Sequence, residues 1–248
     1  MLVPCAITWF PSTKLVGTTV SFCDPYPSTW KLERKLTENT HGIIGNDNAR
    51  EARVVFIGTR VDKPTGEKAI IKIRMQIPHN DTVNLPASKR ARQARHAMLP
   101  FARDEIAALE LLTKQGCTFA PTLLAWKQEK QGADMWVPGG PIVFILMEKV
   151  PGICLADVVD IFLSIKRDER DQLREAFKKA WLECASCGLV NFDAGLNNLV
   201  WDRERQKCYI IDWEASWEAD PEEPFFDHEY LRWGLVEGGA SDPESWEY

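Results

Sequence analysis

The character of this 248-residue chain changes once, near Pro151-Gly152. Before that break, β-branched and apolar runs of strand length dominate, with one stretch of helical periodicity. After it, helical spacing dominates as far as Gly188, and two short apolar runs follow at 199–201 and 209–211. Strands and helices segregated in this way predict an α+β protein with two lobes.

The clearest local pattern lies between residues 53 and 76. Two apolar runs, Val54–Val61 and Ala69–Met75, flank the turn-forming segment Asp62–Gly66, and together they predict a β-hairpin. A helix is predicted from Phe101 to near Gly116. Further strands are predicted at 121–127 and 141–147, and further helices at 155–165, at 170–187 and near 226–236.

Composition excludes several classes of protein. Ten Trp and eleven Phe supply too much apolar surface for a disordered chain. The sequence lacks the run of about 18 apolar residues that a membrane-spanning helix needs. The start of the chain, interrupted by Pro4 and Pro11, lacks the basic and apolar regions of a secretory signal. Seven irregularly spaced Cys suit reduced thiols, so the expected compartment is the cytoplasm, with the nucleus as the alternative.

The net charge of −6 is distributed unevenly. Residues 214–248 hold eleven acidic side chains and one basic side chain, which leaves +4 for the rest. A basic segment from Lys89 to Arg95 either binds phosphate backbones, acts as a localisation signal or is a solvated helix or loop. Because the whole chain is acidic, a general nucleic-acid binder is disfavoured.

Two residues before the break are candidates for chemistry. Lys72 lies within the apolar run Ala69–Ile73, where a buried ammonium needs an anion, unless its side chain emerges at a strand edge. Glu105 borders the apolar stripe of the predicted helix. It either turns inward toward Lys72 or is solvated, and Glu110 is a second candidate for the same role.

Three more candidates follow the break. Asp193 and Asn198, five residues apart, precede an apolar strand, and Asp212 ends the next one. Asp193 can face a reacting hydroxyl. Oxygen ligands from Asn198 and Asp212 suit Mg²⁺. Taken singly, each of these residues is equally explained as a turn or capping residue.

The order of these features resembles the protein-kinase-like superfamily. The segment Ile211-Asp-Trp-Glu214 is similar to the metal motif of its aminoglycoside and choline phosphotransferase branch, and the chain is also similar to short fungal kinase-like sequences. The resemblance covers residues 45–235. It implies a bilobal fold with an antiparallel-sheet N-lobe at 41–150, a reduced helical C-lobe at 151–248 that ends in the acidic tail, and an N-terminal extension at 1–40.

The resemblance also implies a cofactor and residue roles. ATP and Mg²⁺ would bind in the cleft between the lobes. Lys72 would bind the α/β-phosphates with Glu105 as its partner, and backbone groups from Glu148 to Val150 would hold adenine. Asp193 would be the catalytic base. Asn198 and Asp212 would bind the metal ion.

Several departures from the family pattern keep two functions open. Asn191 stands where the family has His, the glycine pattern around 42–48 is poor, and only 36 residues follow Asp212. One reading is a phosphotransferase acting on a small-molecule hydroxyl, and the alternative is an inactive kinase-like (pseudokinase) scaffold with a protein partner. A third possibility is a different reaction in the same cleft.

The acceptor site of an active enzyme would have to use the acidic tail, which suits a cationic acceptor; a solvated or disordered tail is the alternative. The tail residues concerned are Glu214, Glu218, Asp227 and Glu229. Separately, Cys184-x-x-Cys187 has the spacing of a redox or zinc pair, but no second pair accompanies it.

Overall fold

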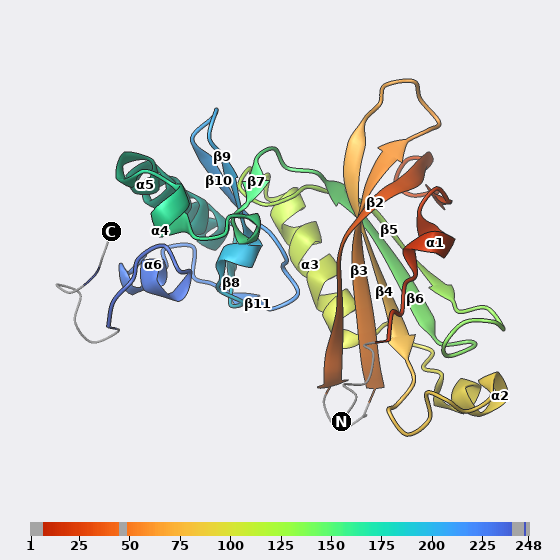
Figure 1. Cartoon of the computed structure of the whole chain (residues 1–248). Coiled ribbons are helices and arrows are strands. Elements are labelled where there is room, and N and C mark those ends of the chain that lie inside the picture. Colours follow the sequence, from red (N-terminus) through yellow and green to blue (C-terminus); the bar gives the residue numbers. More distant parts are fainter. Residues whose placement is uncertain (1–6, 45–48, 240–245, 247–248) are drawn as a thin grey trace. The chain divides into compact units, whose positions relative to one another are not determined.

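The computed structural model describes residues 7–44, 49–239 and 246 (Figure 1). It is a mixed α and β protein whose sheets are antiparallel. Two compact units are present: unit 1 comprises 1–103 and 123–149, and unit 2 comprises 104–122 and 150–248. No helix in the described part of the chain is long and apolar enough to cross a membrane.

Unit 1 is built on a six-stranded sheet with the order β1-β2-β3-β4-β6-β5 (Figure 1). The predicted hairpin is confirmed as β3 and β4, and residues 1–40 contribute β1 and most of β2 to the same sheet. The short helices α1 and α2 and the 3₁₀ turn η2 complete the unit. The bounds are β1 Thr19–Phe22, β2 Ser28–Ile44, β3 Ala49–Arg60, β4 Lys68–Ile77, β5 Leu123–Lys130, β6 Pro141–Glu148, α1 Ser12–Leu15, α2 Ala87–Arg90 and η2 Ala91–Gln93.

Strand β4 separates an apolar face from a polar one by the two-residue period of a strand. Ile71, Ile73 and Met75 enter the hydrophobic core, whereas Lys72 and Arg74 point to the other face. Both basic residues are buried there, with exposed fractions of 4% and 1%. Because β4 is flanked by β3 and β6, Lys72 does not emerge at a sheet edge.

The polar face of the sheet holds a buried ion pair. Arg74 Nη1 donates to Glu51 Oε1 at 2.6 Å.

Arg90 of the basic segment has a structural role. It lies on α2 and donates from Nε to the carbonyl oxygen of Trp136 at 2.6 Å and from Nη2 to the carbonyl oxygen of Met135. Arg90 therefore caps backbone carbonyls, so phosphate binding is not needed to explain this residue of the basic segment.

Unit 2 contains the long helix α5, which buries one face and exposes the other. Its two small antiparallel sheets have the orders β10-β9-β7 and β11-β8. Helix α3, which runs from Pro100 to Lys114, contributes its residues from Asp104 onward to this unit. The other bounds are β7 Ile153–Cys154, η3 Leu155–Asp157, α4 Ile161–Ser164, α5 Arg167–Ser186, β8 Leu189–Asn191, η4 Leu196–Asn198, β9 Leu199–Asp202, β10 Lys207–Ile210, β11 Ser216–Glu218 and α6 His228–Arg232.

The prediction of one helix over 155–165 is wrong. The segment forms a single 3₁₀ turn and a single helical turn, separated by extended backbone at Val158 and Asp160. Asp160 ends the extended stretch because its carboxylate accepts hydrogen bonds from the backbone N–H groups of Phe162 and Leu163, as a helix N-cap does. This capping starts a new helix where apolar spacing alone suggested continuation.

The acidic tail is part of the core of unit 2 over its described residues, which overturns the view of a wholly solvated tail. Phe177, fully buried on α5, contacts the rings of Phe225, Tyr230 and Trp233. Strand β11 pairs with β8. The predicted tail helix is present as α6, shorter than its expected range. Within the glycine pattern at 42–48, residues 45–48 lie outside the described residues.

Candidate metal centre and catalytic loop

The loop from Asp193 to Asn198 is closed by its own side chains. The Asn198 Nδ2 donates to the Asp193 backbone oxygen at 2.7 Å and to Asp193 Oδ2 at 2.9 Å. Asn198 is buried and Asp193 is exposed. Within the described chain nothing bonds Asp193 Oδ1, so one carboxylate oxygen is anchored while the other faces outward, as an acceptor for a proton requires.

Asn191 joins this loop to the segment after β10. Its Nδ2 donates to the carbonyl oxygens of Ile211 and Asp212 at 3.1 and 2.9 Å, and its Oδ1 accepts from the Asp193 N–H at 2.9 Å. The Ile211 N–H also donates to the Asn198 carbonyl oxygen at 2.9 Å. Asn191 appeared in the sequence only as a departure from the family motif. Its amide donates and accepts at once, and it thereby joins the backbone of the loop to the backbone of the segment after β10.

Asp212 adopts a left-handed backbone conformation with φ of 62°. Non-glycine residues rarely do so, although Asp and Asn tolerate it better than most, and such positions gather at functional sites. The neighbouring Trp213 is fully buried, and it stabilises the turn by donating its indole N–H to the Ile210 carbonyl oxygen at 2.9 Å. The turn directs the Asp212 and Glu214 carboxylates the same way.

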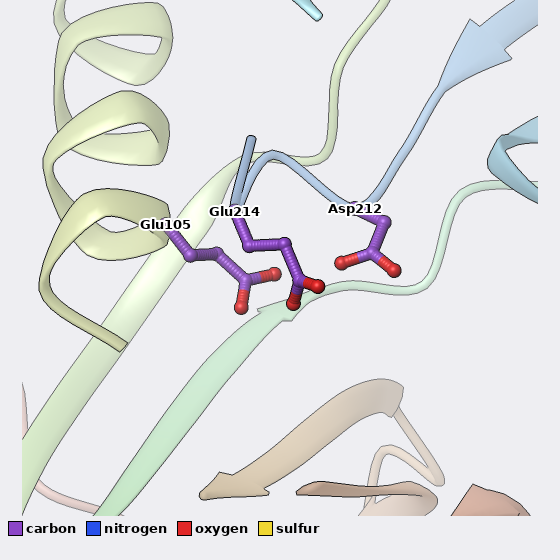
Figure 2. Close-up of side chains that lie close together, drawn as sticks. All are labelled: Glu105, Asp212 and Glu214. Carbon is purple, nitrogen blue, oxygen red and sulfur yellow. The ribbon is translucent and has the colours of Figure 1, made fainter. Parts of the chain in front are cut away.

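Three carboxylates from two segments of unit 2 meet at this turn (Figure 2). One oxygen from each of Glu105 on α3, Asp212 and Glu214 lies within 4.8 Å of the other two. Glu105 is 1% exposed and Glu214 is 7% exposed. Buried carboxylates this close repel one another unless a cation or protons balance their charge. Carboxylate oxygens are hard ligands, which suit Mg²⁺ or Ca²⁺.

The sequence predicted part of this arrangement. The neighbouring positions of the Asn198 and Asp212 segments were expected, and Glu105 is buried rather than solvated, whereas Glu110 is exposed. Glu214, which the sequence suggested for an acceptor site, lies in the carboxylate cluster, and its part in an acceptor site stays a prediction. Its position two residues after Asp212, within the same motif, was the available signal.

The residues predicted to bind the nucleotide are Lys72, Glu148 and Val150, and the structure gives their positions on the strands and in the core. Lys72 is opposite Val55 of β3 and Ile145 of β6 in the sheet register. Glu148 ends β6. Val150 packs in an apolar cluster with Val200 and Tyr209. The nucleotide-binding roles of these residues, and the pairing of Lys72 with Glu105, stay predictions.

A pocket of about 150 Å³ in unit 2 is lined by Asn191 and Phe192, directly before the loop from Asp193 to Asn198. Phe192 and Trp217, each about half exposed, line it with ring centroids 4.3 Å apart. Glu218 and Glu223 also line it, and the charge of Glu229 is balanced by Arg232 at 2.7 Å. The guanidinium of Arg232 sits 5.6 Å from the Phe192 ring centroid. The wall is thus aromatic and net acidic, which favours cations.

Comparison with known proteins adds no family: the sequence matches no protein-family model and no curated protein. The chemistry must therefore be argued from the side chains. An outward carboxylate on Asp193, a set of three hard-oxygen ligands and an aromatic acidic pocket beside them suit metal-assisted chemistry on a polar substrate.

Proposed function

We propose that the protein is an ATP- and Mg²⁺-dependent phosphotransferase that acts on the hydroxyl of a small molecule, with a bilobal kinase-like fold. The observation that carries the proposal is the hydrogen-bond bridge of Asn191. It links the backbone N–H of Asp193 to the backbone carbonyl oxygen of Asp212, so the loop that carries the proposed base and the turn that carries the proposed metal ligand are joined. A transfer to a hydroxyl needs a proton acceptor and a charge-neutralising metal held in one geometry.

In this proposal Asp193 accepts the proton of the attacking hydroxyl. The new bond joins that oxygen to the γ-phosphorus while the bond from the γ-phosphorus to the β–γ bridging oxygen breaks, and ADP leaves. Mg²⁺, when bound, neutralises charge on the phosphates. Asp212 would hold it, and Glu214, Glu105 and the predicted ligand Asn198 are the further candidate ligands. Lys72, Glu148 and Val150 keep the nucleotide-binding roles that the resemblance implies.

The first test is thermal unfolding with nucleotide. A ligand at about 100 times its Kd stabilises by about 2.7 kcal/mol, so Mg²⁺-ATP at millimolar concentration should raise the Tm by several degrees. ATP with EDTA should give a smaller rise, and Mg²⁺ alone sets the baseline. No rise with Mg²⁺-ATP would contradict the proposal. A rise without any ATP turnover would favour the inactive kinase-like scaffold instead.

We place the acceptor in the pocket lined by Phe192 and Trp217, and its aromatic and acidic wall selects a cationic alcohol. Choline and its uncharged isostere 3,3-dimethylbutanol are a matched pair of probes. A cation–π contact is worth about 0.5–2 kcal/mol, so choline should show the lower KM, by about 2- to 30-fold.

Trp217→Ala should remove most of that preference and leave kcat with 3,3-dimethylbutanol nearly unchanged, as measured by ADP release. Phe226→Ala is the control, because Phe226 is a half-exposed aromatic outside the pocket lining. Equal KM values for the two alcohols in the native protein would rule out this acceptor class.

A further inference from the structure

Three cysteine thiols of unit 2, none of which is used in the proposed function, lie close together. Cys117 follows the end of α3, directly after Gly116, whose φ is 72°. Cys184 and Cys187 lie one turn apart at the end of α5. The Sγ atoms of Cys117 and Cys184 are 3.7 Å apart, and Cys187 also interacts with the Cys117 thiol. The sequence indicated only the Cys184 and Cys187 pair, because Cys117 is 67 positions away from Cys184.

The surroundings give these thiols different acidities. The hydrogen bond from Cys184 lowers the pKa of Cys117 to about 7, so much of it is thiolate at neutral pH. The same bond, with burial, raises the pKa of Cys184 well above its ordinary value. Burial, followed by the nearby Cys117, raises the pKa of Cys187 to about 11. One sulfur is therefore a nucleophile and its neighbours remain protonated.

We propose that Cys117 and Cys184 form a reversible disulfide when the protein meets a peroxide. The Cys117 thiolate attacks one oxygen of hydrogen peroxide, the O–O bond breaks, and sulfenic acid and hydroxide form. The Cys184 sulfur then attacks the Cys117 sulfur, its proton leaves with the departing oxygen, and water is released. Two thiols are oxidised and one peroxide is reduced, and a dithiol reverses the change.

The geometry suits this step. The sulfurs must close from 3.7 Å to the disulfide length of about 2.05 Å, a movement that side-chain rotation and small backbone shifts supply. Cys117 remains 8% exposed, enough for contact with a molecule as small as peroxide. The new bond would tie the segment after α3 to α5 across a long loop, which constrains the unfolded chain.

The test is peroxide treatment of the whole protein, followed by alkylation, proteolysis and mass spectrometry. We expect a Cys117–Cys184 linked peptide that lacks two hydrogens, a Tm raised by about 5 °C or more, and loss of both after dithiothreitol. Alkylation of Cys117 before oxidation should follow an apparent pKa near 7. An absent linked peptide, or a link from Cys117 to Cys187 in its place, would overturn the proposal.

Two variants sharpen the result. Cys184→Ser should abolish the link and leave a Cys117 sulfenic acid that dimedone traps. Cys208→Ser is the matched control, since Cys208 is equally buried and its pKa is raised by burial alone. The alkylation profile of the native protein needs no variant, so the proposal remains testable if a variant fails to fold. None of these readouts depends on phosphotransfer.

Discussion

Asp212→Asn should lower ATP turnover by about 10³-fold and abolish the part of the thermal shift that depends on Mg²⁺. The change removes the ionised ligand, and a bound metal ion contributes several kcal/mol to the stabilisation of transition-state charge. Asn is the appropriate replacement because it tolerates the left-handed backbone that Asp212 adopts, at φ of 62°. The fold is thereby kept while the charge is lost.

The control for this variant is Glu110→Gln. Glu110 lies on the same helix as Glu105, but it is exposed and does not belong to the carboxylate cluster. Its removal should leave both turnover and the Mg²⁺-dependent shift unchanged. If Asp212→Asn keeps the full Mg²⁺-dependent shift, the metal site at this turn is wrong.

Asp193→Asn should separate catalysis from binding. Loss of a general base costs about 10²- to 10⁴-fold in rate, so ADP release should fall by that factor. The Tm rise with Mg²⁺-ATP should remain, because Asp193 is outside the carboxylate cluster. The side-chain carbonyl of the new Asn can still accept the Asn198 hydrogen bond, which preserves the loop.

Asp134→Asn is the control for a change of charge alone, since Asp134 is an exposed acidic residue of unit 1 to which no role is assigned. It should leave turnover as it is. Native turnover in Asp193→Asn would remove the proposed role of this carboxylate, even if nucleotide binding is observed.

The sequence predicted most strands and the two long helices because their signals are local. The turn at 62–66 and the apolar runs beside it specify the hairpin, and Gly188, with φ of 93°, ends α5 as expected. The helix predicted over 155–165 failed where apolar spacing competed with the capping side chain of Asp160. Capping acts through one hydrogen-bonding group, which periodicity does not detect.

The candidate site was predictable only in part, for a different reason. Asp193, Asn198 and Asp212 were found because they lie on neighbouring elements of one short stretch. The meeting of Glu105 with Glu214 depends on how α3 packs in unit 2, which no spacing encodes. The sequence likewise did not predict that the Asn191 amide both donates and accepts hydrogen bonds, because these bonds need several backbone segments placed around one side chain.

The anchoring of the described tail on α5 has a consequence for shortened forms of the chain. A product that stopped soon after Glu214 would still encode every residue of the candidate metal centre and of the loop from Asp193 to Asn198. It would nevertheless leave Phe177 without the rings of Phe225, Tyr230 and Trp233, and β8 without its only strand partner among the described residues. Such a product would meet cellular proteases as an incompletely folded chain, so the loss would appear as low abundance before any defect in chemistry could be seen.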